Sequence, residues 1–140
     1  MSDAKTKIQS ILAGPKLASF ATVTEDGRPW VRYVVAMADD AMNLRFATYL
    51  ESRKVAHVKH NPSVHVTLNG SLESEQPYLQ IEGTARVTTD QAERNACWNE
   101  MLSKYFDGPE DPKYAIIVVE PRRIEYWSFD SMEPLVWEKE

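Results

Sequence analysis

Cysteine, glycine and histidine are scarce in this chain of 140 residues, and each shortage excludes a class of site. Cys97 is the only cysteine, so no internal disulfide and no cysteine-based metal cluster can form within one chain. The five glycines stand at positions 14, 27, 70, 83 and 108, a spacing that excludes GxGxxG and P-loop phosphate sites. The GxSxG and HExxH motifs of hydrolases and metalloproteases are absent as well.

The chain also lacks a basic excess and a long apolar run. A formal net charge of -5 argues against general nucleic-acid binding, which usually needs a surplus of Lys and Arg. No apolar run approaches the roughly 18 residues of a membrane span, and the first ten residues, MSDAKTKIQS, hold no apolar signal core. We therefore expect a cytoplasmic protein with no nucleic-acid or membrane partner, in which residues 1–140 form a single domain.

The three histidines invite the question of a metal site. His57 and His60 could share one face of a helix, and His65 begins a nearby strand, but no acidic residue stands at ligand spacing on that helix. We expect no metal and interpret the histidines as a solvated helix side plus one strand residue. Cys97, beside apolar helical positions, is interpreted as a small core thiol.

Periodicity and turn signals predict a mainly β protein, an antiparallel β-barrel of six or so strands with short flanking helices. Gly83 is expected to mark a bend or bulge, and Asp26-Gly27 a hairpin turn. The expected strands are 16–23, 30–37, 44–49, 63–69, 78–89, 113–121 and 122–129; the expected helices are 4–13, the segment between a Ser52 cap and Asn61-Pro62, and 90–106.

The last predicted helix has its own internal signals. Asp90 and Glu93 indicate a capping box at its start. Four large residues recur at helical spacing and predict one apolar face: Trp98, Met101, Leu102 and Tyr105. The tail that follows residue 129 receives no assignment.

The stretch TYLESRKVAHVKHNP, residues 48–62, places two cations where a helix start is already positive. Arg53 and Lys54 follow the expected cap at Ser52. They are either ordinary surface cations or part of an anion site, in which a phosphate would take helix N–H bonds and the Ser52 hydroxyl. Thr48 precedes Ser52 by four residues and would face the same place, while Glu51 could offset the charge.

A third cation, Arg32, interrupts the apolar strand WVRYVVAM. Either this is an edge strand with Arg32 facing water, or the guanidinium needs an anionic or planar partner. If strands 30–37 and 44–49 pair, Arg32 would join Thr48, Ser52, Arg53 and Lys54 around one phosphate. The sequence therefore predicts an anion site at the start of the second helix.

These residues also resemble a known family. RYVVAM followed by FATYLESRKVAHVKHNP is similar to the pyridoxamine 5'-phosphate oxidase-like flavoproteins, and the likeness extends over FATVTEDGRPWVR, IEGTARV and IEYW. It implies a split β-barrel that forms a homodimer with FMN at the interface. By position, Arg32 and Lys54 would contact the FMN phosphate with Arg53 and Ser52 beside them. The remaining cofactor contacts that the resemblance implies are Ala47, Thr48, the backbone of Tyr33 and Val34, and Trp127 from the partner chain.

The chain departs from the oxidases at three places. Met37 stands where they have a lysine, Tyr78 where they have a flavin-contacting glutamine, and SFDSMEPLVWE replaces the segment that holds the pyridoxal substrate. We therefore do not expect pyridoxamine phosphate oxidation, and the chain looks more like the bacterial general stress protein branch. The resemblance implies a flavin-dependent oxidoreductase. The alternatives are a non-enzymatic flavin-binding stress-response protein, or a split barrel that uses a deazaflavin or heme.

Overall fold

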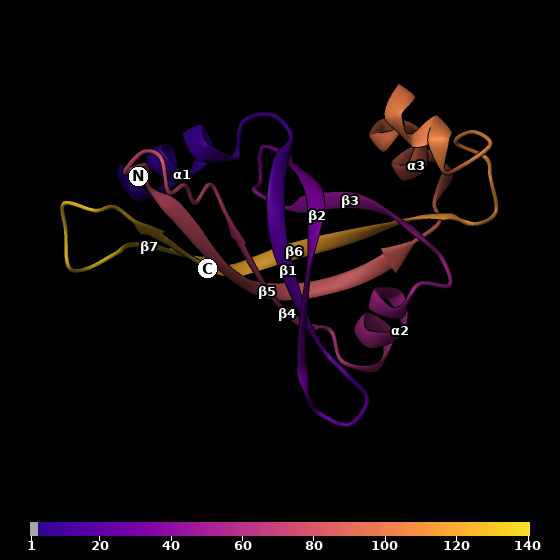
Figure 1. The fold of residues 1–140 in the computed structure, drawn as a ribbon, viewed down its shortest axis with the longest axis horizontal. Coiled ribbons are helices and arrows are strands. Elements are labelled where there is room, and N and C mark those ends of the chain that lie inside the picture. The colour runs from indigo at the N-terminus through magenta and orange to yellow at the C-terminus, as the bar shows by residue number, and fades with distance from the viewer. Residues whose placement is uncertain (1–2) are drawn as a thin grey trace.

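Figure 1 shows a twisted antiparallel barrel with short helices on its outside, in a computed structural model that describes residues 3–140. Of the predicted domain 1–140, the first two residues lie outside the described ones. The sheet order is β3-β2-β1-β4-β5-β6-β7, and a further pairing of β3 with β6 closes six strands into the barrel. The strands are β1 (Lys16–Val23), β2 (Pro29–Ala38), β3 (Leu44–Tyr49), β4 (Ser63–Leu68), β5 (Tyr78–Thr88), β6 (Tyr114–Trp127) and β7 (Leu135–Glu138). The predicted mainly β barrel is confirmed.

Within residues 3–140, three α-helices and one 3-10 helix lie outside the barrel, at different places in Figure 1. Among the described residues, none of these helices has the length and apolar character needed to cross a membrane. They are α1 (Asp3–Leu12), α2 (Arg53–His60), α3 (Gln91–Cys97) and the 3-10 helix η1 (Glu100–Lys104). The cap and stop predicted for α2 are confirmed, since Ser52 is its N-cap and Asn61 its C-cap.

The core fills the barrel because each strand alternates between an inward and an outward residue. In β1, for example, Ala18, Phe20 and Thr22 are buried while Leu17 is exposed. Helix α1 adds Ile8 and three other buried residues at helical spacing to the same core. Helix α2 contributes Val55 and Val58 from one side of its short length.

A second, smaller cluster lies on the outer face of β6, which is buried on both sides over its first half. The outward residues Tyr114, Ile116 and Val118 pack with Phe106, and the segment that contains α3 and η1 covers them. This explains why the sequence of residues 114–119, YAIIVV, is apolar at every position rather than alternating.

Residues 114–127 form one long strand, so the predicted division at Pro121 into two strands is wrong. A register shift lies opposite, between Glu82 and Gly83, and Gly83 pairs with Pro121. Arg122 is the extra residue of this bulge, because Glu82 pairs with Arg123. The bulge absorbs a proline that cannot donate to the ladder and lets the strand continue, and the bulge predicted at Gly83 is confirmed.

The prediction of one continuous helix over residues 90–106 is also wrong, because the structure has two separate helical segments there. Helix α3 ends at Cys97, and η1 begins after Asn99, whose side chain accepts from the Met101 N–H. The interruption rotates the following residues, so Met101 and Tyr105 are exposed rather than packed in one face. The predicted N-cap is present, since Asp90 accepts from the Glu93 N–H, whereas the Glu93 carboxylate binds Arg45 and so forms no reciprocal capping-box bond. In the unassigned tail, β7 pairs with β6.

Strands β2 and β3 pair at only two positions, Met37 with Arg45 and Ala38 with Leu44. Beyond this point β3 continues along β6, while β2 continues along β1. The two strands therefore diverge, and the barrel is split on the side that faces α2. This divergence positions the candidate site.

Candidate anion-binding site

Helix α2 begins at Arg53, a short turn after β3 ends at Tyr49, as the sequence predicts. Ser52 occupies the N-cap position, but its hydroxyl makes no capping bond to the helix. It lies 3.0 Å from the Thr48 hydroxyl instead. The Ser52 hydroxyl therefore accepts no hydrogen bond from the first-turn N–H groups of α2, and it pairs with the Thr48 hydroxyl instead.

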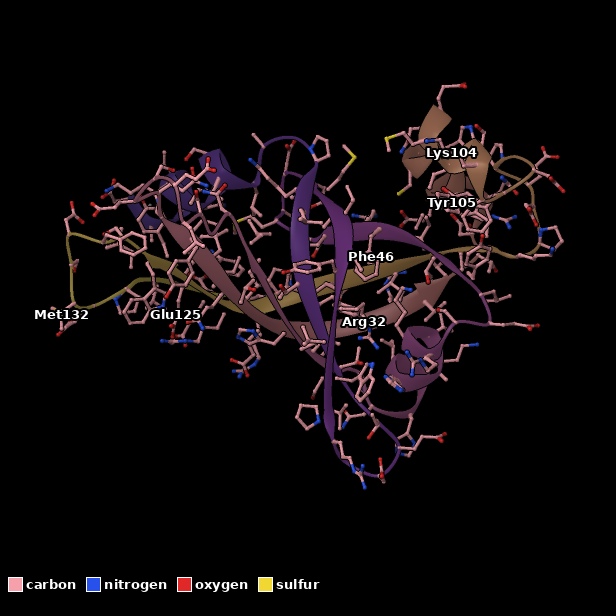
Figure 2. All side chains as sticks on the ribbon, in the orientation of Figure 1. Arg32, Phe46, Lys104, Tyr105, Glu125 and Met132 are labelled. Carbon is pink, nitrogen blue, oxygen red and sulfur yellow. The ribbon has the colours of Figure 1, made fainter. Side chains whose placement is uncertain are left out.

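Arg32 is half-buried on the inward face of β2, in the part of the strand that does not pair with β3. Figure 2 shows it beside α2. Its Nη1 donates to the Thr22 hydroxyl at 2.8 Å and approaches the carbonyls of Phe20 and Trp30 at 3.3 Å. The interpretation of Arg32 as a residue facing water is therefore wrong, because its side chain points inward and contacts β1 and α2, although β3 does not pair with β2 at this position.

We call Arg32, Arg53 and Lys54 the cation cluster. Among residues 3–140, no carboxylate lies within 4.0 Å of a cationic nitrogen of these three side chains. Glu51, which the sequence offered as a counter-charge, is exposed and makes no ion pair with them. Arg53 lies over the ring of Trp30, with 5.4 Å between its guanidinium carbon and the ring centroid.

The electrostatics of the cation cluster are those of like charges held together. Burial, and next the charge of Arg53, lower the pKa of Arg32. Burial, and next the charge of Arg32, lower the pKa of Lys54. Each positive charge makes the charged form of a neighbouring side chain less favourable. An anion bound among the three side chains would offset this repulsion and also the cost of removing the charges from water.

Two residues of the site, Thr22 and His57, were not predicted from the sequence. His57 is buried, so its interpretation as part of a solvated helix side is wrong, and its Nδ1 lies 2.8 Å from the Thr22 hydroxyl. The available signal was a polar residue, Thr22, at an inward position of β1, two residues after Phe20.

Among residues 3–140, no group of three His, Cys, Asp or Glu side chains is arranged to hold a metal ion.

Of the other predicted cofactor residues, Tyr33 and Val34 follow Arg32 on β2 and Ala47 precedes Thr48 on β3, whereas Trp127 is remote from the cation cluster within this chain. The side chain of Tyr33 is on the outer face of β2, while Val34 packs inward against the core. Ala47 faces the outer cluster on β6. Trp127, at the far end of β6, donates to Glu125, and Figure 2 places Glu125 well away from Arg32.

The arrangement is suited to binding rather than to acid–base or nucleophilic chemistry. Cys97 is half-buried in the outer cluster, and burial raises the pKa of its thiol. A groove of 460 Å³ adjoins the cation cluster. It is lined by Arg53, His57 and the β1–β2 turn, including Glu25 and Asp26. The geometry therefore offers an anion three cationic side chains, two hydroxyls and a helix N-terminus.

Comparison with known proteins agrees with this architecture. The family model described as pyridoxamine 5'-phosphate oxidase matches residues 4–128. General stress protein 26 of Bacillus subtilis (strain 168) is 28% identical over 134 residues, covering 95% of this chain and 94% of that protein. The crystal structure of general stress protein 26 from Bacillus anthracis superposes with a TM-score of 0.84 at 31% identity, covering 96% of this chain and 98% of the other.

Solved structures with this fold are described with different cofactors. An F420 reductase is 28% identical with a TM-score of 0.65, covering 83% of this chain and 94% of the other. An FMN-binding protein from Nostoc punctiforme and a heme-binding protein from Mycobacterium smegmatis are each 16% identical and share the fold alone. Because the family model spans nearly the whole chain and the fold agrees with it, the protein belongs to the pyridoxamine 5'-phosphate oxidase family.

Proposed function

We propose that this protein is an FMN-binding flavoprotein of the general stress protein type with flavin-dependent oxidoreductase capacity. The observation that supports this most directly is the cation cluster, in which Arg53 and Lys54 at the start of α2 lie near Arg32 of β2. No carboxylate among the described residues neutralises these three side chains. A phosphate monoester is the anion that best fits a helix N-terminus combined with arginine and lysine.

In this proposal, the protein binds and orients the cofactor. Arg32 and Lys54 hold the phosphate, with Arg53 and the Ser52 hydroxyl beside them, and the Thr48 hydroxyl orients Ser52 at 3.0 Å. FMN, when bound, supplies the hydride and electron chemistry, which accounts for a site without a protein acid or nucleophile. The backbone of Tyr33, Val34 and Ala47 lines the flavin, and Trp127 approaches it from the partner chain.

An apolar stripe on the outside of the barrel supports the proposed homodimer. Five neighbouring outward side chains on β1 and β2 are between 50% and 73% exposed: Leu17, Val31, Tyr33, Val35 and Met37. Leu17 and Tyr33 also line an open groove of 640 Å³. Contiguous exposed apolar area of this kind is typical of protein interfaces, so we place the second copy over the stripe.

Val35→Glu tests the proposed dimer. The side chain is exposed in one chain, so the substitution should leave the fold intact, but in a dimer it would bury an unpaired carboxylate. Such burial costs several kcal/mol, so we expect dimerisation to weaken by about a hundredfold or more in sedimentation velocity over a concentration series. Met101→Glu, at an exposed position of η1, which packs beside the outer face of β6 rather than on β1 or β2, should leave the dimer unchanged. A wild-type monomer, or a Val35→Glu dimer of unchanged affinity, would contradict the proposal.

The test of the proposed cofactor is an absorption spectrum of the purified protein, with FMN added if the protein is colourless. We expect the visible bands of oxidised flavin to stay with the protein through a desalting column. Free FMN passed alone over the same column is the control for incomplete separation. If no flavin stays with the protein, FMN is not its cofactor, and a deazaflavin becomes the next candidate because of the similarity to an F420 reductase.

Turnover separates the oxidoreductase from the alternative, a non-enzymatic flavin-binding protein. An oxidoreductase should reduce its bound flavin with NADH or NADPH and pass the electrons to an added acceptor over many cycles. A carrier should instead release FMN quickly and show no turnover above that of free FMN at the same concentration.

A further inference from the structure

A buried polar pair lies directly behind Arg32. Thr22 is inward-facing on β1 and His57 is on the buried side of α2, and both are at most 9% exposed. Their Oγ1 and Nδ1 atoms lie 2.8 Å apart. Because a buried polar group without a partner is costly, this contact between two elements fixes both side chains.

The direction of each hydrogen bond follows from the donors available. Arginine can only donate, so the 2.8 Å contact runs from Arg32 Nη1 to the Thr22 oxygen. The single Thr22 hydroxyl hydrogen can then go to His57 Nδ1 at 2.8 Å or to the Trp30 carbonyl at 3.4 Å. The shorter contact is favoured, and it requires Nδ1 to be unprotonated with the ring hydrogen on Nε2. Arg32 Nη2, at 3.4 Å from the same Nδ1, is also a donor, so this longer contact shares the one lone pair and is likewise compatible only with an unprotonated Nδ1.

The charges around His57 favour the neutral ring that this arrangement needs. Burial lowers the pKa of His57, and the charges of Arg32 from β2 and Arg53 from α2 lower it further. Glu25, from the turn between β1 and β2, acts in the opposite direction, and Asp26 of the same turn lines the adjoining groove. The lowered pKa favours the neutral His57 imidazole, whose Nδ1 can accept the hydrogen bond that the geometry requires.

The same contacts determine which hydrogens of Arg32 remain available. Its Nη1 is occupied by the Thr22 oxygen and by the carbonyls of Phe20 and Trp30. Within residues 3–140, the Nε–H and the second Nη2 hydrogen of Arg32 donate to no atom. One edge of the guanidinium is thus held by β1, and the other is left for a ligand.

We infer that Thr22 and His57 are positioning residues for Arg32, and that the Arg32–Thr22–His57 relay sets the guanidinium to meet the phosphate of the cofactor. This inference rests on the proposed function, since it concerns the same anion. It adds two residues that do not themselves contact the ligand. The relay joins β1, β2 and α2, so it also fixes the strand that bears Arg32 against the helix that bears Arg53 and Lys54.

Thr22→Val tests the relay because it replaces the hydroxyl with a methyl group of similar size. Arg32 Nη1 then keeps only its two 3.3 Å carbonyl contacts, and the guanidinium is less well held. We expect the dissociation constant for FMN to rise about tenfold, as for the loss of one hydrogen bond to a charged group. The constant for riboflavin, which has no phosphate, should change less than about twofold, and Thr22→Ser should keep the wild-type affinity for FMN.

A second measurement does not depend on the cofactor. Nitrogen-15 NMR of the ligand-free protein near pH 7 should show His57 as the Nε2–H tautomer. A proton on Nδ1 would overturn the relay, as would an unchanged FMN affinity in Thr22→Val. Equal losses for FMN and riboflavin would reduce Thr22 to a purely structural role and also overturn the inference. Wild-type protein that binds no FMN would overturn the proposed function itself, and with it the ligand that the relay serves.

Discussion

Replacing both Arg53 and Lys54 with alanine is expected to weaken FMN binding by about a hundredfold or more while leaving riboflavin binding nearly unchanged. Hydrogen bonds to charged groups are worth about 1.5–3 kcal/mol each, which is at least about tenfold per residue. Fluorescence titration of the two ligands measures both constants on the same protein sample. The phosphate is the only chemical difference between FMN and riboflavin. The ratio of the fold-changes in their two dissociation constants therefore reports the loss of phosphate binding alone.

The stability of the variant should exclude unfolding as the cause of the lost affinity. Arg53 and Lys54 have no carboxylate partner among the described residues, and each lies near another positive charge. Their removal should therefore leave the melting temperature of the ligand-free protein unchanged or raise it. Lys59→Ala with Lys104→Ala removes two exposed lysines, one of them on the same helix, and should preserve FMN affinity. Equal losses for FMN and riboflavin would argue that Arg53 and Lys54 are ordinary surface cations.

Gly83→Ala is expected to lower the free energy of unfolding by about 3 kcal/mol, the upper end of the cost of overpacking. A Cβ atom at this position would lie 2.3 Å from the carbonyl oxygen of Glu120 and 3.0 Å from the Cα of Pro121. Both are backbone atoms of the paired strand, so no side chain can rotate away to make room. Urea denaturation should show the loss as a lower midpoint, and the melting temperature should fall by roughly 10 °C.

Gly70→Ala is the matched control for this prediction. A Cβ atom there would meet nothing within 4 Å, and the backbone of Gly70 does not have a positive φ. Its free energy of unfolding should therefore stay within about 0.5 kcal/mol of the wild type. If the two variants were equally stable, the approach of β5 to β6 at the bulge would have to be adjustable, contrary to the geometry.

The architecture could be predicted because most strands have strong local signals. These signals are local: residues alternate between apolar and polar within β1 and β4, Asp26-Gly27 marks the turn between two strands, and Asn61-Pro62 marks the end of a helix. Each can be recognised from neighbouring residues alone, without knowledge of distant contacts. The predictions failed where residues distant in the sequence determine the end of a strand or helix. Pro121 ends a strand in most contexts, but the bulge opposite Gly83 allows β6 to continue. The helix over 90–106 had the right spacing, but it breaks after Cys97, and Asn99 caps the η1 turn that follows.

For the site, the sequence by itself determined which cations are involved, because Arg53 and Lys54 oppose the helix dipole and Arg32 interrupts an apolar strand. Only the tertiary structure decided that β2 and β3 diverge after two pairs and that Arg32 lies against α2. It alone brings Thr22 and His57, 35 positions apart, within hydrogen-bonding distance. The physical reason is that a charge in the wrong place costs free energy locally and is visible in the sequence, whereas a hydrogen bond between distant residues depends on the packing of the whole barrel.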